Sequence, residues 1–268
     1  MTEMLVRAPT FNFPAPVKPH STLLDVASVQ EGIGFMEPQG LAESYNCMIL
    51  DSTPVWPCPT SASPKSFTDG PVWVDGIRFA VYGGIKCKGP GFSMEEGEGK
   101  ARQAFEAGES VGVERALMTQ RFTTAQGTTD VTPSGGAVNP ALGLSILESH
   151  AACSYVGVPV IHMSRGMASL LAGPGYLIEV GGHLETKMGS VIAAGGGYGC
   201  PNKGPSGANA AADTNWMYVS GAVAVARGDL LIASDIDRTT NDIYILVERP
   251  YVAAVDCYTA AINVKVER

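Results

Sequence analysis

The sequence has 268 residues, of which 45% are hydrophobic and 16% charged, a balance that fits a folded chain and excludes an intrinsically disordered one. Its 18 basic and 26 acidic residues give a net charge of −8, and no Lys/Arg-rich run occurs, so we expect no basic surface for nucleic acid. A protein that only encloses nucleic acid needs no basic surface of this kind. Six scattered cysteines without a C-x-x-C pair argue against zinc, and no apolar run is long enough to span a bilayer.

The N-terminal residues predict no signal peptide, because Met1–Arg7 contains Glu3 and no apolar core follows. Without an oxidising compartment we expect reduced, buried thiols and a soluble protein made in a cytoplasm. Ten of the 18 prolines precede residue 75, so residues 1–40 are predicted to form an extended arm. The apolar side chains of this arm must be covered by its own domain or by a neighbouring subunit; they are Phe11, Phe13, Leu23 and Leu24.

Residues 41–88 are predicted to form a long β-hairpin. Tyr45–Leu50 is one side, Pro54–Asp69 is the Pro- and Ser-rich tip, and Val72–Tyr82 is the alternating return strand with a slip at Gly76. A projecting two-stranded ribbon is marginal in isolation, so we expect it to be supported from outside.

A long helix is predicted from a capping box at Ser93 and Glu96 to about Gln120. Gly108 and Gly112 each cost about 1 kcal/mol relative to Ala in a helix interior. We therefore expect another element to approach the helix closely at these glycines. The side that carries mostly small residues is expected to face this element; it comprises Ala101, Ala104, Phe105, Gly108, Gly112 and Ala116.

The middle of the chain alternates helices and strands. Asn139 and Pro140 begin a helix that runs toward Tyr155, a strand follows at Val158–Met163, and Ser164 caps a helix to about Leu171.

The rest of the chain is predicted to be strands around one loop. Val191–Ala194 is a strand and residues 195–215 are a loop rich in Gly, Ala and Asn. Further strand-like segments follow at Met217–Ala226, Leu230–Ala233, Ile243–Val247 and Tyr251–Val266. Breaks are expected at Arg227–Asp229, Arg238–Asn241 and Glu248–Pro250.

No motif predicts a nucleotide or zinc site. Gly195–Gly199 follows a strand but does not match G-x-G-x-x-G, and Pro201 and Pro205 prevent a following helix. The pair His183 and Glu185 resembles half of a deaminase zinc signature whose P-C-x-x-C half is missing.

Pairs of polar residues such as His162 with Ser164, Glu148 with His150, and Asp235 with Asp237 lack the elbow or ligand set of a catalytic or metal site. We predict no catalytic, cofactor-binding or metal-binding residue, and hence no enzyme.

Several short motifs occur in a characteristic order. They are Gly157–His162 with its following helix, Gly189–Val191 leading to Gly197–Gly199, Trp216–Tyr218 with Gly221, Arg238–Asn241, and Glu248–Arg249. In this order they resemble the major capsid proteins of tailed bacteriophages that infect actinobacteria, which have the Hong Kong 97-type fold. The resemblance covers residues 93–268 by motif and the first 92 by layout.

The resemblance implies an α+β fold of the Hong Kong 97 type. Residues 1–40 would be the N-terminal arm and 41–88 the extended loop that lies over an adjacent subunit. Residues 89–134 and 236–268 would form the peripheral domain, with the spine helix and the C-terminal strands behind it. Residues 135–235 would form the axial domain at the centre of each capsomer.

The function implied is self-assembly into hexamers and pentamers of an icosahedral shell that encloses double-stranded DNA. The partners would be further copies of the chain, with scaffolding, portal, protease or decoration proteins, and the DNA would be held without sequence-specific binding. The protein would be found in the virion capsid, assembled in the host cytoplasm, without a membrane. The chain is short for this family, and although Lys65 could donate to an isopeptide cross-link, no acceptor is assigned.

Two alternatives remain open at this stage. An encapsulin-type nanocompartment shell resembles the same fold and would hold cargo enzymes, whereas a small-molecule enzyme would use a pocket at Gly195–Asn215. The candidate structural or assembly contacts are Trp216, Arg238, Asn241, Glu248 and Arg249.

Overall fold

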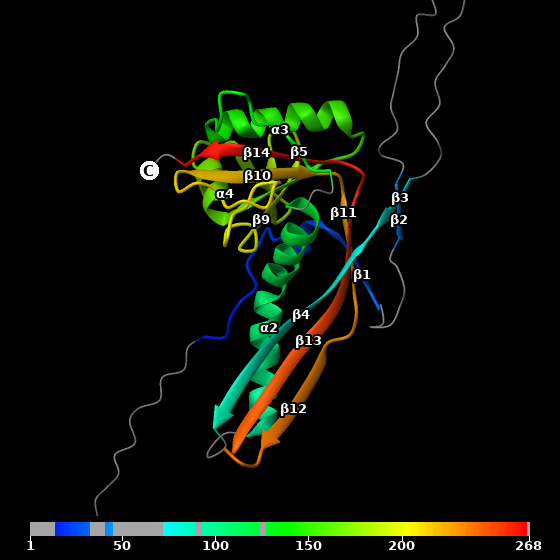
Figure 1. Ribbon diagram of the computed structural model, residues 1–268, viewed down its shortest axis with the longest axis vertical. Coiled ribbons are helices and arrows are strands. Elements are labelled where there is room, and N and C mark those ends of the chain that lie inside the picture. Colours follow the sequence, from blue (N-terminus) through cyan, green and yellow to red (C-terminus); the bar gives the residue numbers. More distant parts are fainter. Residues whose placement is uncertain (1–13, 33–40, 45–71, 89–92, 124–126, 267–268) are drawn as a thin grey trace, which may run out of the picture.

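The computed structural model describes residues 14–32, 41–44, 72–88, 93–123 and 127–266. It contains a long narrow sheet, a seven-stranded sheet and a two-stranded ribbon. Figure 1 shows helix α2 (Met94–Leu117) lying along a long narrow sheet, with a second sheet and two further helices at its C-terminal end. The two ends of the molecule meet where α2 runs into a π-helical turn, η1 (Met118–Phe122).

The long sheet is built around β13 (Asp242–Val255). Strand β4 (Ile77–Lys88) pairs antiparallel with one edge of β13 over its whole length. The other edge of β13 pairs first with β12 (Leu231–Asp237) and then with β11 (Val223–Arg227). Strand β1 (Ser28–Glu31) adds a parallel edge to β11. Every second residue of β13 therefore faces α2, and these residues bury against Ala101 and Phe105; they are Ile243, Ile245 and Val247.

The second sheet has seven strands in the order β5-β14-β10-β6-β9-β8-β7. Its core packs against α3 (Pro140–Ser154) and α4 (Arg165–Ala172). The strands are β5 (Thr129–Asp130), β6 (Val160–Ser164), β7 (Leu177–Val180), β8 (His183–Thr186), β9 (Val191–Gly195), β10 (Thr214–Ser220) and β14 (Thr259–Lys265).

All three predicted helix starts are confirmed by hydrogen bonds. The side chains of Ser93, Asn139 and Ser164 accept the backbone N–H three residues on, at 3.1, 2.8 and 3.3 Å. These N-caps satisfy donors that a helix leaves free at its first turn, which is why the sequence locates the starts well.

The predicted glycine contacts on α2 are half right. A Cβ at Gly112 would lie 2.4 Å from Val81 Cγ1, so β4 does approach α2 there. Gly108 is exposed and a Cβ there would meet nothing within 4 Å, so the expected contact is wrong at this position. The buried side of α2 instead includes two acidic residues, Glu109 and Glu114.

The predicted break at Glu248-Arg249-Pro250 is wrong, because β13 continues through it. Gly228 N donates to Pro250 O at 3.0 Å, so the backbone polar atoms of Pro250 point toward the edge shared by β12 and β11. Strand β12 pairs up to Glu248 and β11 only from Tyr251. Pro250 therefore lies in the gap between them, where a missing N–H costs no ladder bond.

The C-terminal strands are divided between the two sheets. Strand β13 lies behind α2 as expected, but β14 pairs with β10 in the seven-stranded sheet, so the expectation that all of Tyr251–Val266 backs the helix is wrong. The segment Met217–Ala226 is likewise divided at Gly221 between β10 and β11. A Cβ at Gly221 would lie 2.8 Å from Asp256 Cβ, which fits the close crossing of the two connections.

The base of the predicted hairpin is present as β2 (Leu41–Ser44) paired antiparallel with β3 (Val72–Asp75). The slip at Gly76 separates β3 from β4, and β4 belongs to the long sheet rather than to the hairpin. The predicted strand Tyr45–Leu50, the tip and Lys65 lie outside the described residues, as do Phe11 and Phe13. Figure 1 shows β2 and β3 side by side beyond the start of β4.

The expectation of buried, reduced thiols is wrong in several places. Cys153 and Cys200 are exposed, Cys87 is half-buried, and Cys257 is disulfide-bonded. Within the described ranges, the helices are too short or too polar to cross a membrane.

A matched pair of glycine substitutions tests the contact between α2 and β4. Gly108→Ala should raise the free energy of unfolding by about 0.5–1 kcal/mol, because it removes backbone entropy from the unfolded chain without a clash. Gly112→Ala should lower the free energy of unfolding by about 1 kcal/mol. The cost of overpacking against the stiff Val81 side chain exceeds the entropic gain that alanine brings. Urea unfolding of unassembled subunits measures both; equal effects of the two substitutions would contradict the close packing.

Candidate functional site: the polar contacts of the spine helix

The N-terminal segment Lys18–Gly32, called the strap below, crosses α2 and contacts both sheets. Ala194 N on β9 donates to Ser21 O at 2.7 Å, and β1 at the other end of the strap pairs with β11. Between these ends lies the short helix α1 (Leu23–Val26), with Leu23 fully buried. This part of the predicted arm is therefore covered by its own chain.

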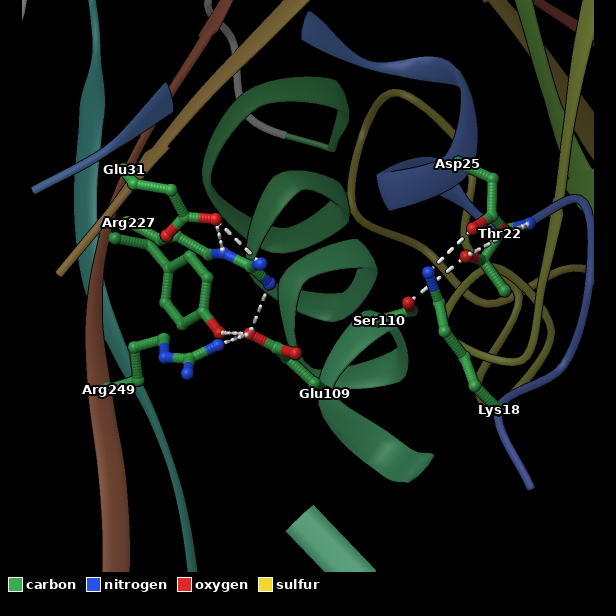
Figure 2. A network of polar contacts seen from close by, with 9 residues as sticks. Lys18, Thr22, Asp25, Glu31, Glu109, Ser110, Arg227 and Arg249 are labelled. Atoms are coloured by element: carbon green, nitrogen blue, oxygen red, sulfur yellow. Dashed lines mark hydrogen bonds and ion pairs between the residues drawn. The ribbon is translucent and has the colours of Figure 1, made fainter. Parts of the chain in front are cut away.

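One group of contacts centres on Glu109, whose side chain is only 8% exposed. Its Oε1 accepts from Arg249 Nη1 at 2.5 Å, from Arg227 Nη1 at 3.2 Å and from the Tyr251 hydroxyl. Arg227 Nε also donates to Glu31 Oε1 at 2.7 Å, which extends this Glu109 cluster to the strap. Figure 2 shows Glu109 leaving α2 toward Arg227 and Arg249, with Glu31 beyond them.

The charges of the Glu109 cluster balance, since two carboxylates face two guanidinium groups. Hydrogen bonding to Arg227 lowers the pKa of Glu31, and the same bond raises the pKa of Arg227. Burial and the bond to Glu109 raise the pKa of Tyr251 well above its usual range, which keeps its hydroxyl a donor. A buried carboxylate needs such partners because the low-dielectric interior penalises an unpaired charge.

The second group of contacts lies on another side of α2. Asp25 Oδ2 accepts from the Thr22 backbone N–H and from Thr22 Oγ1, both at 2.8 Å. Thr22 Oγ1 therefore accepts from Ser110 Oγ at 3.0 Å in the buried interior. Lys18 Nζ lies 2.6 Å from Asp25 Oδ1. Burial alone would raise the pKa of Asp25, but bonds from Lys18 and Thr22 outweigh it and lower the pKa. Figure 2 shows Ser110 and Glu109 pointing away from α2 in different directions, so the strap is fastened on two sides.

A second acid, Glu114, is completely buried against the Gly195–Gly199 loop. Its Oε2 accepts from Gly197 N at 2.9 Å and its Oε1 from Leu23 N at 3.2 Å. A Cβ at Gly195 would fall 1.9 Å from the Glu114 carboxylate, so only glycine fits there. Burial raises the pKa of Glu114 against the opposing effect of the two N–H donors. The glycine run thus wraps a carboxylate of its own chain, and the space in which a phosphate would have to lie is filled.

The junction between η1 and the seven-stranded sheet contains the fully buried His162. Ser220 Oγ donates to Gly221 O at 2.7 Å, so it accepts from His162 Nε2 at 2.8 Å. Nδ1 then accepts from the Tyr198 hydroxyl at 3.0 Å. This arrangement assigns a neutral imidazole, and burial lowers the pKa of His162 to about 3.

The predicted contact residues lie in different parts of the molecule. Trp216 is half-buried on β10, and its backbone N–H donates to Asn202 Oδ1 at 2.7 Å. Arg238 and Asn241 are exposed in the turn between β12 and β13, where Asn241 has φ +53°, a conformation that Asn tolerates well.

The remaining two predicted residues are neighbours on β13 and are both half-buried. Arg249 belongs to the Glu109 cluster, whereas Glu248 faces away from α2 because it alternates with Val247. The structure does not bring the five predicted residues together.

The motifs weighed for catalysis form no common site. Ser164 caps α4 and His162 binds Tyr198 and Ser220, while Glu148 accepts from Thr186 and Ser190. His150 instead binds Tyr258 at 2.6 Å, and His183 lies 3.0 Å from Glu185. Among the described residues there is no group of three or more His, Cys, Asp or Glu side chains placed to hold a metal ion.

The residues that the sequence missed are the ones that fasten the strap. Nothing in the spacing marks Glu109 and Glu114 as buried, since acidic residues on a helix usually face solvent. Their partners are distant in the chain: Arg227 is 118 and Arg249 is 140 residues from Glu109. The one visible signal is the glycine run, which by itself predicts a loop and does not identify the buried carboxylate that the loop surrounds.

The comparisons with known proteins give a fold. No protein-family model matches the sequence. No curated protein matches it either. Three solved structures similar to the chain over nearly all of both chains are the holo-SrpI encapsulin complex from Synechococcus elongatus (12% identity, TM-score 0.54, 98% of this chain and 94% of that one), the capsid of an empty GTA particle (13%, 0.53, 97% and 96%) and the capsid of Ralstonia phage GP4 (8%, 0.52, 100% and 98%).

These likenesses show that the chain has the Hong Kong 97-type capsid fold. The predicted α+β fold class of the Hong Kong 97 type is confirmed. At these identities the likeness establishes the fold and leaves the function to be argued from the molecule.

The Glu109 cluster makes a prediction for stability. Glu109→Gln removes the charge that two largely buried guanidinium groups share, so the free energy of unfolding should fall by about 3 kcal/mol. The matched control is Glu96→Gln, which breaks the exposed pair of Glu96 with Lys100 and should cost less than about 0.5 kcal/mol. Urea unfolding measures the two losses; a loss for Glu109→Gln as small as that of the control would contradict the role given to the cluster.

His162 makes a prediction for pH dependence. Its pKa falls from 6.5 to about 3 on folding, so only the unfolded chain binds its proton between these values. Stability from this group is therefore complete above pH 6.5 and is lost as pH falls toward 3, by up to about 1.4 kcal/mol per pH unit. Urea midpoints at pH 7, 6 and 5 should fall in the parent and fall less in His162→Gln. Parallel pH profiles of the two proteins would contradict the assignment.

Proposed function

We propose that this chain is a shell subunit, a bacteriophage major capsid protein that assembles into hexamers and pentamers of an icosahedral shell around double-stranded DNA. The observation that carries the proposal is a complete Hong Kong 97-type fold whose β2–β3 ribbon extends beyond the body. Two strands alone are marginally stable in water, so a ribbon of this kind is best explained by cover from a second copy.

The buried polar groups support a structural role. The Glu109 carboxylate accepts hydrogen bonds from two arginines and a tyrosine of the same chain. The Glu114 carboxylate accepts from two backbone N–H groups. Groups satisfied in this way hold elements together rather than await a substrate. The proposed product of folding is therefore a rigid body with defined outer surfaces.

The strand pairing supports a division into four parts. The arm and the extended loop would take residues 1–40 and 41–88, apart from β1 and β4, which pair within the long sheet. The peripheral domain, assigned from sequence to 89–134 and 236–268, would consist of α2 and the long sheet and so include β11 and β12. The axial domain, assigned to 135–235, would consist of the seven-stranded sheet and so include β14.

The predicted contact residues receive different roles under this proposal. Arg238 and Asn241, exposed at the far end of the long sheet, would contact neighbouring subunits. Glu248, on the sheet face away from α2, would do the same. Trp216 and Arg249 would act within the subunit, the first by holding the Asn202 loop and the second through Glu109.

The proposed setting follows from the same assignment. Assembly would take place in the host cytoplasm and the mature protein would be part of the virion capsid. Portal, scaffolding, protease or decoration proteins would join the shell, and the net charge of −8 suits DNA that is confined without sequence-specific binding. We propose no catalytic activity, cofactor or membrane partner.

The structural likeness to an encapsulin supports one alternative function, in which the shell encloses protein cargo instead of DNA. The two functions differ in content rather than in subunit structure. Nuclease-protected DNA inside shells isolated with their native gene neighbours would support the capsid, whereas protein cargo would support the compartment.

The assembly test removes the outer part of the extended loop. Ser44 and Val72 are register partners in the β2–β3 pair, so an Asn-Gly turn should close the strands when residues 45–71 are deleted. We expect the full chain to form closed shells in electron micrographs and the shortened chain to remain unassembled. The urea midpoints of the two proteins should be equal when both are measured with the Cys257 disulfide reduced. Regular shells of the shortened chain would contradict the role of the loop, and a full chain that stays a monomer or small oligomer over a wide concentration range would overturn the shell assignment.

A further inference from the structure

The β2–β3 ribbon is joined to the body at two places of unequal strength. On one side β3 continues into β4 after the single residue Gly76, and β4 is held by twelve register pairs with β13. On the other side residues 33–40 connect β2 to β1, which is held by only four register pairs with β11. Strand β3 also contacts β13. We expect the direction of the ribbon to depend on this side together with the weaker second attachment.

Strand β1 has little apolar cover. Ser28, Gln30 and Glu31 are exposed and only Val29 is half-buried, so burial contributes little to its docking at the edge of the sheet. After the end of β1, Gly32 has φ +93° and its backbone N–H donates to Arg227 O at 2.9 Å. What holds β1 is therefore backbone pairing together with the bond of its last residue to Arg227.

The bond between Glu31 and Arg227 is the outer link of the Glu109 cluster. The side chains become steadily less exposed toward the helix, from 64% for Glu31 through 27% for Arg227 to 8% for Glu109. The inner link is shielded from salt, whereas the outer link is open to screening by ions. Arg227 thus remains oriented by Glu109 even when Glu31 leaves it, which permits β1 to dock again in the same place.

We propose that β1 and the Glu31–Arg227 ion pair form a releasable anchor that fixes the direction in which the β2–β3 ribbon leaves the body. The anchor itself is a property of the folded subunit. Its consequence for assembly rests on the proposed function: a fixed ribbon direction sets the angle between neighbouring subunits, and so the uniformity of the shells.

Hydrogen exchange of the unassembled subunit tests the anchor. Glu31→Gln should speed amide exchange by about two- to fivefold in residues 28–31, 224–227 and 72–75, the range expected for loss of one largely exposed ion pair. The matched control Glu96→Gln breaks an ion pair that is also largely exposed, on the N-terminal part of α2, and should leave these segments unchanged. The parent in 1 M NaCl should resemble Glu31→Gln. Exchange in Glu31→Gln at the parent rate would overturn the anchor.

A disulfide lock provides the opposite perturbation. Gln30 and Ala226 are register partners on neighbouring strands, which lie about 4.8 Å apart, within the span of a disulfide. In the Glu31→Gln background, Gln30→Cys with Ala226→Cys should return exchange to the parent rate when oxidised and leave it fast when reduced. Fast exchange in residues 72–75 of the oxidised lock would show that β1 does not control the ribbon, and would overturn the proposal.

Electron microscopy of assembled particles separates the anchor from the shell assignment. Shells of Glu31→Gln should vary more in diameter than those of the parent or of the oxidised lock. Equal diameter distributions would overturn the role of the anchor in assembly. If the parent forms no shells, the proposed function fails, while the exchange rates of the subunit still decide whether the anchor exists.

Discussion

The need to give a buried carboxylate its partners determines how this molecule is joined together. Helix α2 carries two acids on its inner side, and the interior gives neither of them water. Glu109 is satisfied by arginines from β11 and β13, and Glu114 by backbone N–H groups from the strap and the glycine loop. Because these donors come from distant parts of the sequence, the helix joins the strap, the glycine loop, β11 and β13 to one another.

The glycine loop and the strap follow from the same constraint. The Glu114 carboxylate leaves no room for a side chain at Gly195, so this position must be glycine. The reason for glycine here is therefore the buried carboxylate and not the approach of a nucleotide phosphate. The strap brings Leu23 into the core and Thr22 to Ser110, and so spans the joint between the sheets. The glycine loop and the strap therefore surround α2 with groups of the chain itself at the joint between the two sheets.

The same design separates firm contacts from weak ones. The attachment of α1 is buried and depends on packing, whereas β1 is an exposed edge held by backbone pairing and by one ion pair that is partly open to solvent. Firm contacts maintain the body, and weak contacts lie at the base of the ribbon that would meet a neighbour. In a shell assembled from many identical subunits, adjustment at such a point costs little free energy compared with adjustment of the core.

Sequence alone determined the features that are set by neighbouring residues. Caps at Ser93, Asn139 and Ser164 located the helices because side chain and backbone meet within three residues, and the order of the motifs gave the fold. Sequence did not determine which strand joins which sheet, since β13 and β14 have the same apolar character and differ only in their distant partners. It also could not identify Glu109, Glu114, Arg227 and the strap as one unit. Those contacts join residues about 80 to 200 positions apart, and only the tertiary structure turns acids that should face water into the buried centre of the subunit.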